Sequence, residues 1–104
     1  MNLLFICNQN KNRSKTAEEL FKPFYETRSR GLYGGKKLTQ KDTRWAEIIF
    51  VMEEDQAEQL RTKFPQAYTT KRIICLDIPD IYSYQQPKLI QSIKENMKKY
   101  KHLL

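Results

Sequence analysis

The sequence has little cysteine, little histidine and no long apolar run. It contains 2 cysteines and 1 histidine among 104 residues. Two cysteines cannot build a disulfide framework, and neither has another cysteine or a histidine nearby at the spacing of metal ligands. We therefore expect reduced thiols, no metal site and a cytoplasmic location.

Targeting and repeat signals are also missing. No apolar run approaches membrane-spanning length, and the N-terminus lacks the basic and apolar regions of a signal peptide. Internal repeats, low-complexity tracts and linker-like composition shifts are absent too. The sequence thus predicts a soluble protein with one domain, residues 1–104, and no membrane partner.

The sequence carries an excess of positive charge. Lys and Arg total 19 against 12 Asp and Glu, which gives a formal net charge of +7. Such a balance attracts anions of any kind, whether phosphorylated ligands, nucleic acid or acidic proteins. The C-terminal lysines 94, 98, 99 and 101 are typical of the solvated face of a helix, and no nucleic-acid motif accompanies them. We do not expect nucleic acid as a partner, and the sequence indicates no particular oligomeric state.

Apolar runs alternate with segments of helical spacing along the whole chain. Continuous apolar strands separated by short helices indicate βαβ units, so we expect an α/β fold: a single three-layer domain with a four-stranded, mainly parallel sheet flanked by helices. The expected strands are 2–6, 27–30, 48–52 and 72–76. The expected helices run from Ser14 to near Pro23, from Thr39 to Trp45, from Glu54 to Lys63, where Phe64-Pro65 ends the helix, and from Pro87 to Tyr100.

The stretch CNQNKNRS follows the first expected strand and leads into the first expected helix. In open parallel sheets, ligands bind beyond the carboxyl ends of the strands, and free N–H groups at a helix N-terminus favour an anion. A loop that curls around a phosphate usually needs glycine, and this one has none. Asn8, Asn10 and Asn12 can replace it, because asparagine is well tolerated in the left-handed region.

Two side chains of this stretch suggest chemistry. Arg13 offers a planar fork that can hold two phosphate oxygens. Inward-facing amides, the helix dipole and Arg13 would favour the thiolate of Cys7, and Ser14 could donate a hydrogen bond to the sulfur. The alternative is that Cys7 is an inert core residue and Arg13 a solvated helix residue. For Cys75, inside the expected strand RIICL, packing is the preferred interpretation.

Several stretches resemble the low-molecular-weight protein tyrosine phosphatases. They are LLFICNQNKNRSKTAEELF at the N-terminus, RSRG at 28–31, LTQKDTRWAEIIFVME at 38–53 and IPD at 78–80, and they occur in that family's order. The compact length and LDIPDIYSYQQPKLI are similar to a shorter, predicted protein-tyrosine-phosphatase branch. This resemblance covers most of the chain and implies a metal-independent phosphomonoester hydrolase without a cofactor.

The resemblance also implies roles for individual residues. Cys7 is expected to be the nucleophile, Arg13 the phosphate clamp, Asn10 a loop support with unusual backbone geometry, and Ser14 the partner of the thiolate. Asp80 matches the general acid, which protonates the leaving oxygen and then activates water. The remaining loop positions are expected to bind phosphate or support the loop: Asn8, Gln9, Lys11 and Asn12.

The sequence departs from the family pattern at three of these places. The family has Asp-Pro at the acid, whereas Asp80 is followed by Ile81, and Asp77 is close enough to be an alternative acid. Gln9 replaces the usual loop glycine, and Asn12 replaces a frequent second cysteine. The second change removes a disulfide partner and no catalytic group.

The substrate expected from the resemblance is a phosphotyrosine protein or a small aryl phosphate. Tyr82 and Tyr84 are candidates for one aromatic wall of the pocket, and Tyr33 for the facing wall. Trp45 is expected in the core, and His102, near the C-terminus, is not expected to be catalytic.

Two other functions remain open. One is a phosphate-binding or adaptor module that keeps the loop but lacks a working acid. The other is arsenate reduction, which would need Cys75 as the second thiol of an electron relay.

Overall fold

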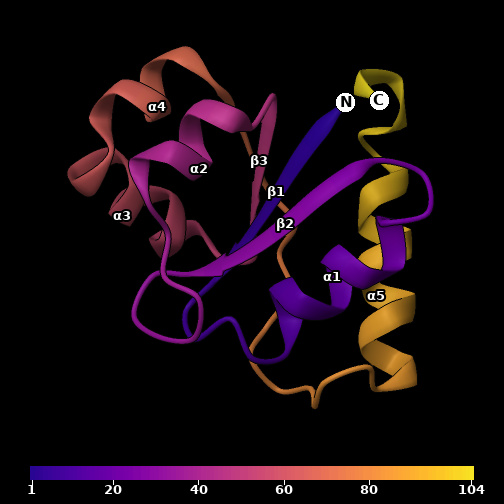
Figure 1. The fold of residues 1–104 in the computed structure, drawn as a ribbon. Coiled ribbons are helices and arrows are strands. Elements are labelled where there is room, and N and C mark those ends of the chain that lie inside the picture. Colours follow the sequence, from indigo (N-terminus) through magenta and orange to yellow (C-terminus); the bar gives the residue numbers. More distant parts are fainter.

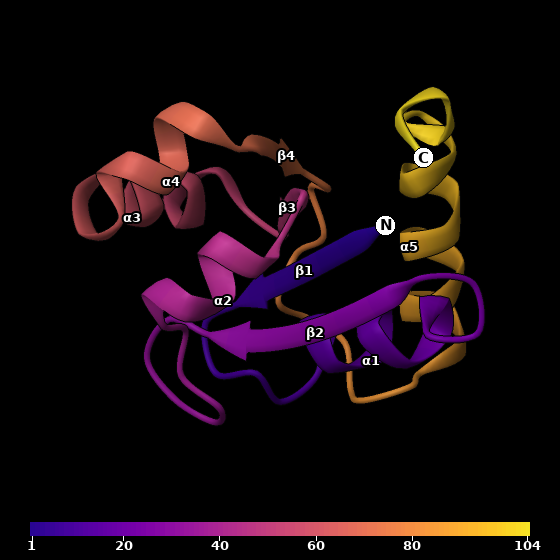
Figure 2. The same cartoon turned by 45° about the horizontal axis from the view of Figure 1, so that its top comes forward.

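The computed structural model describes residues 1–104 and contains one parallel sheet of four strands. The strand order is β2-β1-β3-β4, and every neighbouring pair is parallel. Figure 1 shows β2, β1 and β3 side by side, and Figure 2 also shows β4. The predicted fold class is thus confirmed, and each predicted strand is present, with its ends shifted by at most one residue. The strands are β1 (Asn2–Cys7), β2 (Glu26–Gly31), β3 (Ile48–Val51) and β4 (Arg72–Cys75).

Helices cover both faces of the sheet, which gives the three expected layers. α1 (Arg13–Phe21) and α5 (Pro87–Lys98) lie on one face (Figure 2). The other face carries α2 (Gln40–Trp45), α3 (Glu54–Lys63) and α4 (Pro65–Thr70). A 3-10 turn, η1 (Lys101–Leu103), follows α5. No helix has the length and apolar character needed to cross a bilayer.

The central strand β1 is buried on both faces because its side chains alternate between two cores. Leu3, Phe5 and Cys7 belong to the core under α1 and α5. Leu4 and Ile6 belong to the core on the opposite face. The continuous apolar run in the sequence therefore reflects a strand covered on both sides. The alternation of side chains places Cys7 on the face covered by α1.

The helix α4 was not expected from the sequence. Phe64-Pro65 was expected only to end the preceding helix, and it does so, but Pro65 is also the first residue of α4. Proline is suited to a first helical turn because the N–H that it lacks has no partner there. Two helices end slightly earlier than predicted. α1 ends at Phe21, before Pro23, and α5 ends at Lys98, before Tyr100.

Two predictions about single residues need comment. Trp45 packs against the core on the α2 face but is only partly buried, and the Arg28 guanidinium lies 4.1 Å from its ring centroid. Trp45 was expected to be a core residue, but the Arg28 cation covers one side of its ring. His102 is exposed and lies in η1. Figure 1 shows the C-terminus close to the N-terminus.

Asp42 fixes the start of α2 and ties it to the sheet. Thr39 and Asp42 form the expected capping box, and Asp42 also pairs with Arg28 and Arg30 of β2 at 3.2 and 2.9 Å. Burial alone would raise the pKa of Asp42, but hydrogen bonds from Thr39 and the charge of Arg30 outweigh it, so this pKa lies below its usual value. The loop between β2 and α2 is therefore held firmly at both ends.

Candidate active site

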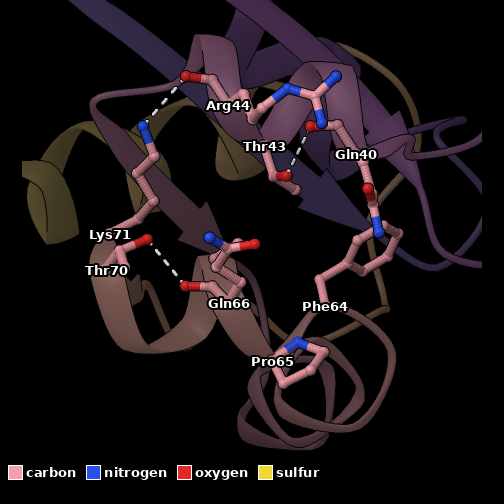
Figure 3. A pocket seen from close by; sticks show the side chains of 9 residues that line it. Gln40, Thr43, Arg44, Phe64, Pro65, Gln66, Thr70 and Lys71 are labelled. Carbon is pink, nitrogen blue, oxygen red and sulfur yellow. Dashed lines mark hydrogen bonds between the residues drawn. The ribbon is translucent and has the colours of Figure 1, made fainter.

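A cavity of about 250 Å³ lies between α2 and α4 (Figure 3). Its lining contains no thiol and no carboxylate, and several of its polar groups bond to one another. Lys71 Nζ donates to the Arg44 carbonyl at 3.0 Å, and the Thr70 and Thr43 hydroxyls donate to carbonyls of their own helices. This cavity offers neither a nucleophile nor a general acid.

A smaller cavity, of about 160 Å³, lies at the carboxyl ends of the parallel strands. It is lined by residues that the sequence singled out as a candidate site: Cys7, Asn8, Gln9, Lys11, Asn12, Arg13 and Asp80. The chemistry of this lining makes it the candidate active site although it is smaller.

The backbone of the loop after β1 has free donors. In the segment from Asn8 to Ser14, no backbone N–H group donates to a protein acceptor. Asn12, the N-cap of α1, makes no side-chain cap bond either. Such a run of free N–H groups, ending in a helix N-terminus, is suited to hold an anion.

Asn10 gives this loop its curl and its support. Its φ is 53°, in the left-handed region, as its residue type allows. Its Nδ2 donates to the hydroxyls of Ser14 at 3.0 Å and Ser29 at 2.9 Å, and its Oδ1 accepts from Lys36 N at 3.2 Å. The carboxamide of Asn10 is thus bonded at both ends, which fixes the loop against β2 and the segment that follows it.

The Cys7 sulfur faces a hydroxyl donor. Cys7 Sγ lies 3.0 Å from Ser14 Oγ, and both side chains are buried. Since Ser14 Oγ accepts a hydrogen bond from Asn10, its own proton remains free for the sulfur. The Ser14 hydroxyl can therefore donate a hydrogen bond to the sulfur.

The loop after Cys7 contains no glycine, but the segment that packs against it contains Gly31, Gly34 and Gly35. A Cβ on Gly31 would approach Gly34 O to 2.1 Å and both Asn10 N and Asn8 O to 3.0 Å. Gly35, with φ of 64°, would place a Cβ 2.4 Å from Gln9 O. The segment after β2 thus packs backbone to backbone against the loop, and only glycine leaves room for this approach.

Arg13 is buried, with 2% of its side chain exposed, and is held by groups from two other strands. Its Nη1 lies 3.1 Å from Glu53 Oε1, just beyond β3, and donates to the Ile78 carbonyl, beyond β4, at 2.7 Å. These partners compensate the buried charge and orient the guanidinium. Sequence reasoning missed Glu53, and the one available signal was an acidic residue directly after the apolar run IIFVM.

Gln56 was also missed. It is fully buried in the first turn of α3, where its Oε1 accepts from the N–H groups of Met52 and Glu53 at 2.7 and 3.0 Å. Its Nε2 donates to Asn8 Oδ1 at 3.1 Å. One side chain therefore connects the turn that carries Glu53 with the loop after Cys7. Nothing in its sequence position distinguishes it from a surface glutamine.

The two candidate acids lie in different surroundings. Asp80 is 63% exposed at the cavity, with Oδ1 3.8 Å from Arg13 Nε. Asp77 is absent from the cavity lining, and its Oδ1 accepts a hydrogen bond from Cys75 Sγ at 3.3 Å. The geometry favours Asp80 over Asp77 as a proton donor to a group bound at Cys7.

The three tyrosines expected as pocket walls do not line the cavity. Tyr82 packs its ring against the core, with its hydroxyl 3.4 Å from Ser92 Oγ of α5. Tyr84 donates to Glu19 of α1, and this bond raises the pKa of Tyr84. Tyr33 lies beside Lys63, whose Nζ is 4.7 Å from the ring centroid. Each ring finds an apolar or charged partner elsewhere, and this is the physical reason for the difference.

Cys75 is partly buried and packs against the core on the α3 face. Burial, with further contributions from Asp77 and Glu54, raises the pKa of the Cys75 thiol to about 12. Glu54, Cys75 and Asp77 have donor atoms close enough to share a metal ion, an arrangement that sequence spacing did not indicate. None of the three lines the cavity at Cys7.

Comparisons with known proteins give structural matches only. No family model and no curated protein matches the sequence. The tyrosine phosphatase Wzb from Escherichia coli K30, solved with phosphate, is 20% identical with a TM-score of 0.80, over 99% of this chain and 97% of that one.

Two further solved structures agree in coverage. The low-molecular-weight protein tyrosine phosphatase from T. tengcongensis is 19% identical with a TM-score of 0.80, over 100% of this chain and 99% of that one. The YwlE arginine phosphatase from Geobacillus stearothermophilus is 18% identical with a TM-score of 0.77, over 98% and 89%. The chain therefore has the fold of the low-molecular-weight protein tyrosine phosphatases along its whole length.

Proposed function

We propose that this protein is a metal-independent phosphomonoester hydrolase that works through a cysteinyl-phosphate intermediate. The observation that carries the proposal is the set of free N–H groups from Asn8 to Ser14 beside the sulfur of Cys7 and the buried Arg13. Together they form an anion site with a nucleophile at its base. The fold shared with solved phosphatases supports the same conclusion.

In the first step the loop amides and Arg13 hold the phosphoryl oxygens, and Cys7 Sγ attacks phosphorus. The phosphorus–oxygen bond to the substrate breaks, and Asp80 gives its proton to the leaving oxygen. In the second step the Asp80 carboxylate takes a proton from water, whose oxygen attacks phosphorus. The phosphorus–sulfur bond breaks, phosphate is released, and Ser14 stabilises the thiolate that leaves.

As substrate we propose phosphotyrosine in a protein, or a small aryl phosphate, in the cytoplasm. Two of the three compared proteins are tyrosine phosphatases, whereas one is an arginine phosphatase. Phosphoarginine is therefore included as a second substrate in the test.

Steady-state hydrolysis in the presence of EDTA tests the proposal. We expect turnover of p-nitrophenyl phosphate and of a phosphotyrosine peptide, with competitive inhibition by vanadate. Binding of inorganic phosphate without turnover of any substrate would instead support an adaptor module. Faster turnover of phosphoarginine would keep the mechanism and change the substrate class.

Arsenate reduction is disfavoured by the positions of the two cysteines. Strands β1 and β4 are separated by β3, so their ends lie about 10 Å apart, two interstrand spacings. Cys7 belongs to the core under α1, and Cys75 packs against the core on the other face. A disulfide needs Cα atoms within about 7 Å, and these residues do not meet that condition.

A further inference from the structure

The segment from Leu76 to Gln86, here the acid loop, has backbone hydrogen bonds to the sheet only at its start. Leu76 N donates to Val51 O at 2.8 Å, and Ile78 N donates to Met52 O at 2.9 Å. From Pro79 to Tyr84, the loop's own N–H groups donate to no backbone acceptor. Asp80 lies in this weakly tied part, so other contacts must set its distance from the sulfur.

The Tyr82 ring packs against the core, and Asp80 Oδ1 lies 3.8 Å from Arg13 Nε. Further contacts of the acid loop come from one face of α1. Arg13, Thr16 and Glu19 are three residues apart and therefore share a face of the helix. Arg13 bonds to the Ile78 carbonyl at the start of the acid loop, as described above. Thr16 and Glu19 contact the end of the same loop, so α1 joins both ends of the acid loop to the helix that begins at the phosphate-binding residues.

Thr16 provides the buried part of this attachment. Its side chain is 1% exposed, and its Oγ1 accepts a hydrogen bond from Gln85 N at 3.0 Å. Gln85 has a φ of 58°, a left-handed conformation that is unfavourable for a residue with a Cβ. Gln85 is the third residue of a turn that Gln86 N closes on Ser83 O at 3.1 Å, and the buried hydrogen bond to Thr16 fixes this turn against α1.

Glu19 provides the exposed part. Its Oε2 accepts hydrogen bonds from the Tyr84 hydroxyl and from Gln85 Nε2. Hydrogen bonds at an exposed carboxylate are weaker than a buried one, since water competes for the same groups. The contribution of Glu19 is therefore smaller than that of Thr16.

We propose that Thr16 is a positioning residue, assisted by Glu19, which holds the acid loop so that Asp80 reaches the leaving oxygen. The proposal rests on the proposed function. It separates two tasks within one helix: Arg13, at the start of α1, binds the phosphoryl group, and the next turns of α1 set the proton donor.

Substrates with different leaving groups provide the test. Protonation of the leaving oxygen matters greatly for phenyl phosphate and little for 2,4-dinitrophenyl phosphate, whose phenolate leaves unaided. We expect Thr16→Val to lower kcat/KM about tenfold for phenyl phosphate and less than about twofold for 2,4-dinitrophenyl phosphate. Thr16→Ser keeps the acceptor and should restore the wild-type ratio of the two values.

The Asp80→Asn variant supplies the reference. Its kcat/KM should also fall more for phenyl phosphate than for 2,4-dinitrophenyl phosphate, and by a larger factor than in Thr16→Val. Equal losses of Thr16→Val on both substrates, or no loss on either, would overturn the positioning role. Absence of Cys7-dependent hydrolysis in the wild-type protein would instead refute the proposed function, so the two failures are distinguishable. Circular dichroism of each variant shows whether a loss comes from unfolding.

Discussion

The two cysteines occupy equivalent positions in the fold and have opposite surroundings. Cys7 and Cys75 are the last residues of the parallel strands β1 and β4. After Cys7 the chain presents free N–H groups, a hydroxyl and a buried guanidinium. After Cys75 it presents the carboxylate of Asp77, and the thiol has a raised pKa. A place at a strand end is therefore insufficient for a nucleophile, and the residues that follow decide the chemistry.

The largest expected effect separates the two thiols directly. Cys7→Ser should lower kcat for p-nitrophenyl phosphate by roughly 10⁴-fold or more, because a serine hydroxyl at this site lacks a base to activate it. Cys75→Ser should leave kcat within about twofold of wild type, since removing a thiol outside the cavity touches no reacting group. Comparable losses of kcat in the two variants would contradict the assignment of Cys7, and not Cys75, as the nucleophile.

Alkylation by iodoacetate should distinguish the thiols without any substrate. With its pKa raised to about 12, Cys75 is almost entirely in the thiol form at pH 7. We expect carboxymethylation of Cys7 to be at least about 10²-fold faster and to be slowed by inorganic phosphate. Deprotonation increases with pH, so modification of Cys75 should rise about tenfold per pH unit toward 12. Peptide mass spectrometry measures both rates, and equal rates at pH 7 would count against the comparison.

The neighbouring aspartates allow a matched pair of variants. Asp80→Asn should lower kcat/KM for phenyl phosphate about 10²-fold, because the leaving oxygen loses its proton donor. Asp77→Asn should change it by less than about threefold, because Asp77 faces Cys75 and not the cavity. A pH–rate profile of both variants measures this. If the acid-dependent limb were lost in Asp77→Asn and kept in Asp80→Asn, the assignment would be reversed.

The smallest expected effect concerns the packing behind the Cys7 loop. Gly31→Ala would place a methyl group 2.1 Å from Gly34 O and 3.0 Å from Asn10 N, so the loop amides must shift. We expect kcat/KM to fall about tenfold, with weaker inhibition by vanadate. The alkylation rate of Cys75 should remain unchanged, because no glycine contacts that strand end. An unaltered affinity for vanadate would show that the amides do not depend on this support.

Much of this arrangement could be predicted from the sequence, because its signals are local. Apolar runs identify the four strands, and the Cys-x5-Arg spacing between a strand and a helix places Cys7 and Arg13 at one cavity. Residue type made Asn8, Asn10 and Asn12 candidates for a left-handed conformation, and of these three only Asn10 adopts it. The resemblance to the phosphatase fold agrees with the solved structures.

The parts that could not be predicted depend on contacts between distant segments. Glu53, just beyond β3, pairs with Arg13, and Gln56, in α3, bonds to Asn8, and no spacing in the sequence indicates either contact. Tyr82 and Tyr84 were expected at the pocket because they follow Asp80, but the Tyr84 hydroxyl bonds to α1 and the Tyr82 hydroxyl lies beside α5. Sequence shows which side chains are close along the chain, whereas their direction depends on packing.

Trapping the intermediate tests the central claim most directly. Wild-type protein mixed with an aryl phosphate, quenched in acid within milliseconds and digested, should yield a peptide in which Cys7 carries one phosphoryl group. The same peptide from Cys75→Ser protein should be labelled equally. Steady release of phosphate with no label on Cys7 would contradict the account.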